Sequence, residues 1–383
     1  MEDNILTSIA KIKVLGVGGA GNNSIRSLIN SVNVEGVSFI AINTDKQALK
    51  NIANDELILQ IGNEHGRGAG AKPEIGKESA LTSEQEIKKR ISNTELVIIA
   101  AGMGGGTGTG ASPEIARMAK EQGALTLAVI TTPFEFEGHK RMRVAKQGLE
   151  ELKKHVDGYI IVSNEKLINA FGELPLNDSW KYSNKTLKQL IRSIIDITTM
   201  PSAINLDFAD LQSLILNNPG EIVVGIGKAS GTDKAQVAVT NALKSPVLET
   251  NIIGAKECMV HVAIGSNGTL NDIKTVANTV KEIIGQDVEI MFGYHQIADK
   301  NKESADSLTV TIIAAGINSD VPKSTQQIHE EVNAKILNSN IQFESESTRE
   351  ISLNASNAND YIANNFADTN DFTNENLLED VFG

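Results

Sequence analysis

The sequence of 383 residues contains one cysteine, Cys258, and only 4% aromatic residues. A single cysteine excludes a framework of intramolecular disulfides and suits a reducing compartment. No apolar run approaches the length that crosses a bilayer, and the first residues lack the basic and apolar segments of a signal peptide. The formal charge of −13 argues against a general nucleic-acid binder. We therefore expect a cytoplasmic protein that binds no nucleic acid and does not insert into membranes.

Short apolar runs alternate with helical patterns along the first 171 residues. Strands are predicted at 12–16, 37–42, 57–61, 96–101, 125–130 and 158–162, and helices at 22–30, 73–91, 111–122, 137–154 and 165–171. This alternation predicts a mostly parallel, Rossmann-like α/β sheet that is covered by helices on both faces.

A long amphipathic helix is predicted next, capped by Asp178 and stopped by Pro201. At ~1.5 Å per residue it is roughly 33 Å long. A second series follows, with strands at 221–227, 258–264, 288–292 and 308–315 and helices at 233–243 and 270–284. We predict a first domain at 1–175, a central helix at 176–202 and a smaller C-terminal α/β domain at 203–318.

The last 65 residues, 319–383, differ in composition from the rest. They hold twelve acidic and three basic residues, a net charge of −9 out of the total −13. We predict a disordered acidic tail. Its end places Leu377, Leu378, Val381 and Phe382 on one helical face, which fits a docking peptide about as well as a frayed terminus.

Residues 102–110 read Gly-Met-Gly-Gly-Gly-Thr-Gly-Thr-Gly, between a buried strand and a helix. Six glycines in nine positions leave the backbone N–H groups accessible, and with the following helix N-terminus they form a cradle for an anion. Thr107 and Thr109 add hydroxyl groups, and Pro113 suits the first turn of the helix. A flexible linker is the alternative, but it does not explain the flanking strand and helix. Phosphate binding is therefore the favoured interpretation.

A second glycine-rich motif, Gly16-Val-Gly-Gly-Ala-Gly21, follows the first predicted strand, and Asp45 ends the next one. Alone, the motif is compatible with an NAD-binding fingerprint. Together with the loops at 66–70 and 102–110, it lies at the carboxyl ends of parallel strands, where ligands of such sheets bind. Two glycine loops that face one crevice suit a triphosphate better than a dinucleotide.

Other polar residues allow two interpretations. Glu137 and Arg141 could contact ribose and phosphate, or form an ordinary helical ion pair. Trp180 could stack on a base that Asn184 reads, or pack in the core. The histidines and the cysteine show no metal-ligand spacing, so no protein-ligated metal site is predicted.

The segment Asn205-Leu-Asp207-Phe-Ala-Asp210 follows the long helix. Its carboxylates could polarise a water molecule, or simply cap a helix. Because the long helix carries this segment roughly 33 Å from the cradle, it cannot serve a nucleotide of the same chain, although it could serve a neighbour's.

These motifs resemble, in order and spacing, the tubulin/FtsZ family of GTPases over about residues 10–318. The specific part is the glycine-threonine run at 102–110; Gly16–Asn23, Asn43–Asp45, Gly66–Pro73, Phe136–Arg141 and Asn205–Asp210 match the other family loops. Trp180 stands where the family usually has phenylalanine, and Ser163 where proline is common. The end of the tail lacks the proline and arginine of the usual docking peptide.

The resemblance implies that GTP or GDP is bound with Mg²⁺, which is held through phosphates and water. The expected nucleotide-binding residues are Gly18, Gly19, Ala20, Gly21, Asn22, Asn23, Asp45, Gly70, Ala71, Gly102, Gly104, Gly105, Gly106, Thr107, Gly108, Thr109, Pro133, Glu137, Arg141, Asn164, Trp180 and Asn184. Among them, Asn23, Asn164, Trp180 and Asn184 would surround the guanine. Asn205, Asp207 and Asp210 would enter the next subunit's site, where the two aspartates help to activate water.

The expected activity is GTP hydrolysis that is activated by head-to-tail polymerisation into filaments of the bacterial division ring. Expected partners are other copies of the chain and, through the tail, division regulators or membrane tethers. Two alternatives are a nucleotide-binding filament protein with little hydrolysis and, less favoured, an NAD-dependent oxidoreductase.

Overall fold

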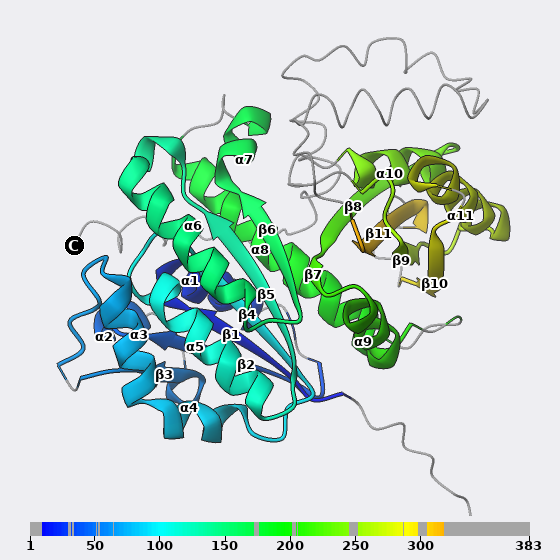
Figure 1. Cartoon of the computed structure of the whole chain (residues 1–383). Coiled ribbons are helices and arrows are strands. Elements are labelled where there is room, and N and C mark those ends of the chain that lie inside the picture. Colours follow the sequence, from blue (N-terminus) through cyan, green and yellow to red (C-terminus); the bar gives the residue numbers. More distant parts are fainter. Residues whose placement is uncertain are drawn as a thin grey trace, which may run out of the picture.

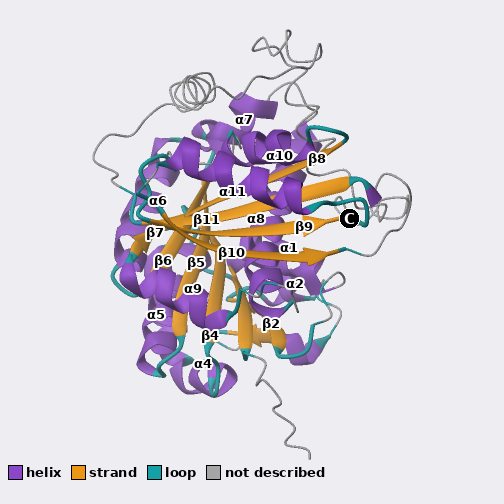
Figure 2. Cartoon of the chain, turned by 90° about the vertical axis from the view of Figure 1, so that its right-hand side faces the viewer, coloured by secondary structure: helices purple, strands orange, loops and turns teal. Residues whose placement is uncertain are grey.

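The computed structural model describes residues 10–317 apart from 30–31, 33, 51, 53, 64, 172–175, 201–203, 205, 245–251, 286 and 298–304, and the side chains of 168–182. The predicted tail, 319–383, lies outside the described residues. The chain forms two β-sheets on either side of a central helix, α8 (Figures 1 and 2). In the described residues, no helix is both long and apolar enough to cross a bilayer.

The first sheet has seven parallel strands in the order β3-β2-β1-β4-β5-β6-β7. Their bounds are β1 Ile12–Val17, β2 Val37–Asn43, β3 Ile58–Gln60, β4 Leu96–Gly102, β5 Leu125–Thr132, β6 Gly158–Ser163 and β7 Gly220–Glu221. The order runs outward from β1 in both directions, so the exits of β1 and β4 flank the point where the winding reverses. That point is where ligands bind in sheets of this kind.

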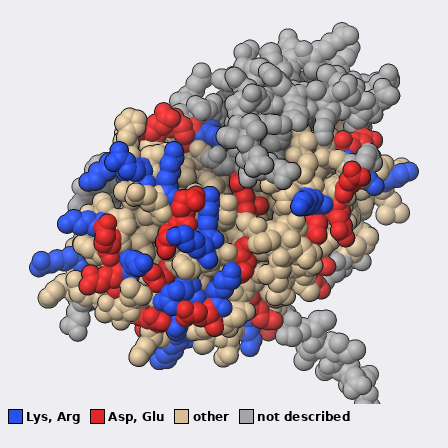
Figure 3. All heavy atoms as spheres, in the orientation of Figure 1, with Lys and Arg blue, Asp and Glu red and all other residues tan. Residues whose placement is uncertain are grey.

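Helices cover both faces of this sheet, because its strands bury side chains on both sides. They are α1 Gly18–Ile29, α2 Lys46–Leu49, α3 Pro73–Thr82, α4 Glu84–Ile91, α5 Thr107–Glu121, α6 His139–Lys153 and α7 Asn164–Phe171, with 3₁₀ turns at Asp55–Leu57 and Glu135–Glu137. Acidic and basic side chains alternate over the outer face of α3 to α6 in Figure 3. Many of them form ion pairs, such as Lys88 with Glu84 and Arg117 with Glu121. This face is a solvated, charge-balanced surface.

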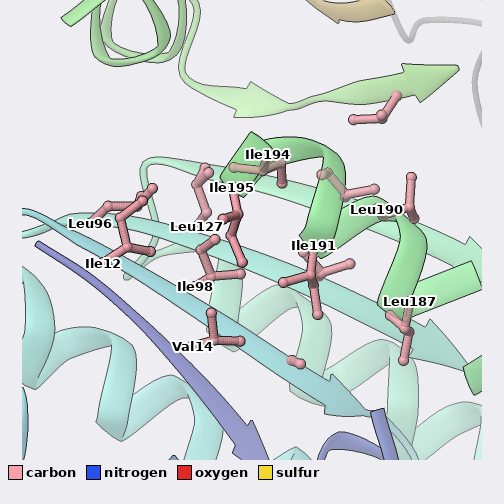
Figure 4. Close-up of a cluster of buried hydrophobic side chains, with 14 of the residues drawn as sticks. Ile12, Val14, Leu96, Ile98, Leu127, Leu187, Leu190, Ile191, Ile194 and Ile195 are labelled. Atoms are coloured by element: carbon pink, nitrogen blue, oxygen red, sulfur yellow. The ribbon is translucent and has the colours of Figure 1, made fainter. Parts of the chain in front are cut away.

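Helix α8, Leu176–Thr199, packs on the other face of the sheet and links the two domains. Leu187, Ile191 and Ile194 lie on its buried side, against Val14 and Ile98 of the central strands (Figure 4). The same cluster of buried side chains continues into the C-terminal sheet through α8. The apolar periodicity that predicted this helix is therefore explained by one continuous core.

The C-terminal domain contains a four-stranded mixed sheet in the order β10-β9-β11-β8. Its elements are α9 Phe208–Asn217, β8 Val223–Ser230, α10 Lys234–Leu243, β9 Glu257–Ile264, α11 Leu270–Ile284, β10 Glu289–Gln296 and β11 Ser307–Ala315. Strands β9 and β10 are parallel, and β11 is antiparallel to both of its neighbours. Helices α10 and α11 bury their apolar sides against this sheet.

The predicted fold class is confirmed, with local corrections. The helix expected at 73–91 is two helices that meet at Ser83. The Ser83 hydroxyl accepts a hydrogen bond from the Gly62 N–H at this break. The strand expected at 221–227 is divided between the two sheets: β7 pairs with β6, and β8 pairs with β11. Asp178 lies inside α8, which begins at Leu176, and is not its N-cap.

Candidate functional site

Five loops meet at one edge of the first sheet, because its strands are parallel and their carboxyl ends point the same way. Strand β1 leads directly into Gly18 and α1, β2 into Thr44, and β4 into Met103. Strand β5 leads into Pro133, and β6 into Asn164. The convergence predicted from the strand exits is thus present in the structure.

Two helices begin earlier than their sequence patterns indicate. Helix α1 starts at Gly18 rather than near residue 22, and α5 at Thr107 rather than at 111. Pro113 is consequently the seventh residue of α5 and not part of its first turn, as expected from the sequence. The low helix propensity of glycine hides these first turns. The N-terminal N–H groups of α1 and α5 therefore belong to the glycine motifs themselves, and the two N-termini are adjacent, since a Cβ on Gly18 would lie 2.9 Å from the Gly108 nitrogen.

Glycines in the motifs fall into two groups according to what surrounds them. A Cβ on Gly21 would lie 2.2 Å from the Ala100 carbonyl oxygen, and one on Gly108 would lie 2.4 Å from the Gly102 carbonyl oxygen. Those two glycines allow close backbone packing. By contrast, a Cβ on Gly19, Gly70 or Gly105 would meet no atom within 4 Å.

Gly19 and Gly105 come from two different loops, and packing within the chain requires neither of them to be glycine. Gly70 differs, because its φ of 56° itself favours glycine. Bare backbone beside open space at two helix N-termini is what close approach of a phosphate group requires. Gly19 and Gly105 therefore leave room beside the N-termini of α1 and α5.

The two threonines of the cradle also form contacts within the protein. Thr107 Oγ1 lies 2.7 Å from Thr44 Oγ1, and Thr109 Oγ1 accepts a 2.8 Å hydrogen bond from the Gly104 N–H. Both cradle threonines are buried. These bonds connect β2 and the loop after β4 to the first turn of α5. Thr44 was missed as a site residue, although its place between β2 and Asp45 was a signal for it.

Asn22 is buried and supports the β1 exit from inside. Its surroundings orient the amide so that Nδ2 donates to the carbonyl oxygens of Gly16 and Gly18, while Oδ1 accepts from Asn43 Nδ2. The neighbouring Asn23 is exposed. Asn22 therefore holds the loop in place, and Asn23 is free to face a ligand.

The loop between β3 and α3 closes one side of the site. Its backbone binds to the β2 exit, where the Gly68 N–H donates to the Thr44 carbonyl oxygen at 3.2 Å. The backbones of Asp45 and Arg67 form an antiparallel β-bridge, and the Asp45 carboxylate caps α2 by accepting the Gln47 N–H at 2.8 Å. Ala71 has a φ of 57°, a left-handed conformation unusual for a residue with a Cβ. This strained turn brings the loop close to Gly106, whose Cβ position lies 3.0 Å from the Lys72 nitrogen.

Helix α6 supplies the opposite wall. A Cβ on Gly104 would lie 2.7 Å from Pro133 Cγ and 2.8 Å from Arg141 Cγ, so both residues border the cradle. Arg141 Nη1 pairs with Glu137 Oε2 at 2.6 Å, and Glu137 Oε1 accepts the Phe134 N–H at 3.0 Å. The ion pair that the sequence allowed is therefore present. The Arg141 side chain remains half exposed.

The residues expected around a base come from α1, α7 and α8. Helix α8 packs against both α1 and α7. Asn164 begins α7 and is buried, with its Oδ1 2.7 Å from the Ser183 hydroxyl of α8. Asn184 is partly exposed next to Ser183. Trp180 belongs to α8, and its side chain lies outside the described residues.

The acidic segment lies at the opposite end of α8 from this site (Figure 1). The 24 residues of α8 span about 36 Å. Asp207 caps α9 by accepting the N–H groups of Ala209 and Asp210, and Asp210 Oδ2 accepts the Asp207 N–H at 3.0 Å. Asn205 lies outside the described residues. The structure thus brings together the described nucleotide-binding candidates but not the two aspartates.

The single cysteine or a metal cluster could also be a centre of chemistry outside this site. Burial raises the pKa of the Cys258 thiol to about 12, so it is not a ready nucleophile. Among the described residues, no group of three or more His, Cys, Asp or Glu side chains could hold a metal ion.

Comparison with known families and structures agrees with this geometry. Residues 11–172 match the model "Tubulin/FtsZ family, GTPase domain", and residues 220–318 match "FtsZ family, C-terminal domain". The cell division protein FtsZ of Mycoplasmopsis pulmonis is 41% identical over 346 residues, covering 90% of this chain and 87% of that protein. FtsZ of Buchnera aphidicola subsp. Acyrthosiphon pisum is 40% identical over 340 residues, covering 88% and 87%.

A solved structure, the empty FtsZ dimer of M. jannaschii, superimposes with a TM-score of 0.76 at 36% identity. The superposition covers 84% of this chain and 92% of that chain. The similarity therefore includes both domains and the helix between them.

Proposed function

This chain belongs to the tubulin/FtsZ family, and on that premise we propose that it is a cell-division GTPase that polymerises head to tail and hydrolyses GTP between adjacent subunits. The observation that carries the proposal is that the glycine motifs after β1 and β4 form the adjacent N-termini of α1 and α5, where a Cβ on Gly18 would lie 2.9 Å from the Gly108 nitrogen. Two adjacent helix N-termini with bare glycine backbone suit the negative charge of a nucleotide's phosphates.

In the proposed complex, the phosphates lie on the N–H groups of Gly18–Asn23 and Gly104–Thr109, with Gly102 and the Gly70–Ala71 turn beside them. Arg141 offsets phosphate charge and Glu137 accepts ribose hydroxyl groups, with Pro133 and Asp45 at the rim. The base lies between Asn23, Asn164, Trp180 and Asn184. The NAD-dependent alternative is not retained, because the matching family model describes a GTPase domain.

Mg²⁺ would accompany the nucleotide. Such an ion would keep several waters and need no dedicated set of protein ligands. When bound, it would offset phosphate charge. The protein's part is to hold the phosphates in place.

The proposed hydrolysis uses groups from two subunits. We propose that Asn205, Asp207 and Asp210 of the next subunit enter the site and that the two aspartates orient and deprotonate the attacking water. The length of α8, about 36 Å, supports this arrangement, because it holds the aspartates far from their own nucleotide. A contact between two different faces repeats without closing and forms an open filament.

In the cell, the proposed filament forms in the cytoplasm at the division site. We propose four parts for the chain: a GTP-binding domain at 1–175, a central helix at 176–202, an activation domain at 203–318 and a tail at 319–383. A flexible tail of 65 residues reaches roughly 45 Å, enough to present residues 377–382 to a regulator or membrane tether.

A filament protein with little hydrolysis is the second candidate. It is favoured by the capping bonds of Asp207 and Asp210, which give both carboxylates a structural role within one subunit. The two candidates differ in turnover only, so both predict that GTP causes sedimentable polymer.

Phosphate release against protein concentration separates them. The shared-site enzyme should show almost no turnover below a critical concentration and rising specific activity above it, in step with polymer in the pellet. Polymer without phosphate release would support the second candidate. Turnover by dilute monomer at the full rate would contradict the shared site.

A mixing experiment tests the division of labour directly. Gly108→Val should lose the cradle, because even a Cβ there lies 2.4 Å from the Gly102 carbonyl oxygen, while Asp210→Asn should lose the water-activating acid. Each variant alone should be inactive. Mixtures should regain turnover, because a cradle from the second variant can meet acids from the first. Mixtures that copolymerise yet stay inactive would contradict the proposal.

A further inference from the structure

Asn164 and Ser183 form a buried pair at the side of the site where the base is proposed to bind. Asn164 is the first residue of α7, at the exit of β6, and Ser183 is the eighth residue of α8. Their side-chain oxygens are 2.7 Å apart, and each residue is 5% exposed. The bond joins the loop edge of the sheet to the helix that carries Asn184.

The bond fixes which way the Asn164 amide points. A separation of 2.7 Å is typical of an O–H···O bond, whereas N–H···O bonds are usually ~0.2 Å longer. The Ser183 hydroxyl therefore donates to Asn164 Oδ1. Among the described residues, no group pairs with Asn164 Nδ2, and this nitrogen is not sealed from solvent. The pair presents the Asn164 NH₂ group as a free donor, while Oδ1 is turned towards the Ser183 hydroxyl.

We propose that Ser183 is a positioning residue for base selection: it locks the Asn164 amide with its NH₂ group towards the ligand, so that the site accepts a purine with a carbonyl at position 6. The inference rests on the proposed nucleotide site and adds a residue that does not itself touch the base. Guanine carries an acceptor oxygen at that position, whereas adenine carries a donor amino group. A fixed NH₂ donor therefore favours guanine, whereas adenine would place its own donor opposite the Asn164 donor.

Without Ser183, the amide could turn to offer its oxygen instead, because the two ends of an asparagine side chain have nearly the same shape. The hydroxyl thus converts an adaptable residue into a selective one. Rejection of the wrong base comes from a buried polar group that would be left unpaired.

The test compares three nucleoside diphosphates, which are not hydrolysed, on the full chain by calorimetry. GDP and inosine 5′-diphosphate both carry the 6-carbonyl group, and the diphosphate of 2,6-diaminopurine riboside carries an amino group there. Ser183→Ala should weaken GDP and inosine diphosphate equally, about tenfold, and leave the diaminopurine nucleotide unchanged. The ratio of the affinity for GDP to that for the diaminopurine nucleotide should therefore fall about tenfold. The ratio of the affinities for GDP and inosine diphosphate should stay constant.

Three further variants make the result specific. Ser193→Ala is the matched control, because that hydroxyl lies on the same helix and donates only to the Gln189 carbonyl oxygen at 2.9 Å. Ser183→Thr retains the hydroxyl and should keep the wild-type preference, which covers the case in which Ser183→Ala does not fold. In an Asn164→Ala background, Ser183→Ala should not change selectivity any further.

Equal weakening of all three nucleotides by Ser183→Ala would show a general structural role and overturn the inference, as would an unchanged preference. Failure of the wild-type chain to bind GDP would instead contradict the proposed function. The two failures are therefore distinguishable.

Discussion

Thr44 and Thr107 share a buried hydrogen bond, 2.7 Å between hydroxyl oxygens, across 63 residues of sequence. Thr44 follows β2, and Thr107 is the first residue of α5. The bond therefore sets the position of the α5 N-terminus relative to β2 and to the loop that Thr44 also holds through Gly68. A ligand that binds the α5 N–H groups depends on this placement.

Replacing only one threonine of this pair should lower the free energy of unfolding at least as much as replacing both. Thr44→Val leaves the buried Thr107 hydroxyl unpaired and should lower the free energy of unfolding of the nucleotide-free protein by ~1–2 kcal/mol. The double variant Thr44→Val/Thr107→Val should be no less stable than this single variant, because no orphaned hydroxyl remains. Urea denaturation measures both. Additive losses would show that the two hydroxyl groups are independent.

Two glycines of the same loop should respond differently to an added methyl group. A Cβ at Gly105 meets no atom within 4 Å, so Gly105→Ala should leave the unfolding of the empty protein almost unchanged and weaken GDP binding at least tenfold, because the methyl group would occupy ligand space. A Cβ at Gly108 lies 2.4 Å from the Gly102 carbonyl oxygen, so Gly108→Ala should destabilise the empty protein by ~1–3 kcal/mol. Thermal melting with and without GDP distinguishes the effects. If Gly105→Ala bound GDP with normal affinity, the ligand would not lie beside Gly105.

A pair of histidines joins two strands of the C-terminal sheet close to α8. His295 Nδ1 lies 3.0 Å from His261 Nε2, and the rings are within 20° of parallel. Burial, and then the neighbouring His295, lower the pKa of His261 to about 4. Burial also lowers the pKa of His295, opposed by Asp196 of α8, which Arg192 pairs at 3.2 Å. The pair is therefore neutral at pH 7, with one N–H donated between the rings.

This pair should make the protein sensitive to acid. The folded-state pKa of His261 is below its ordinary value of 6.5, so the unfolded chain binds the proton first as the pH falls. The contribution to stability is complete above about pH 6.5 and is lost between pH 6.5 and about 4, by ~3 kcal/mol in all. His261→Gln should flatten the stability profile over this range in denaturation experiments at several pH values. Parallel profiles for the two proteins would show that other groups titrate.

The sequence predicted the parallel sheet, the long helix and the second domain because hydrophobic periodicity reports burial, and burial made those elements. It placed the starts of α1 and α5 four residues late, because glycine lowers helix propensity whether or not tertiary packing compensates. Gly21 and Gly108 lie where a Cβ would collide with neighbouring backbone, and a single sequence does not reveal such a contact. Local patterns therefore predicted the elements better than their ends.

The site could be predicted only in part for a related reason. The glycine motifs at strand exits indicated the cradle, since topology alone brings such exits together. Ser183 gave no signal, because a serine inside a helix is ordinary until its partner, here Asn164 nineteen residues away, is known. For Asp207 and Asp210 the sequence allowed two roles, helix capping and activation of water. The structure shows the capping role, and the proposed catalytic role requires a second subunit.

Substitutions at Asp210 can separate capping from chemistry. Asp210 Oδ2 accepts the Asp207 N–H at 3.0 Å, so Asp210→Ala should lower stability by ~1 kcal/mol through the loss of this bond. Asp210→Asn retains an acceptor oxygen and should keep most of that stability, but its amide cannot take a proton from water. Both variants should bind GTP and form filaments, and both should lose turnover at least a hundredfold in phosphate-release assays. If only the alanine variant lost turnover, and in proportion to its lost stability, Asp210 would serve as a cap alone. Equal loss of turnover in both variants would assign the carboxylate to the reaction. Both variants lack its negative charge, whereas the asparagine variant keeps the capping oxygen.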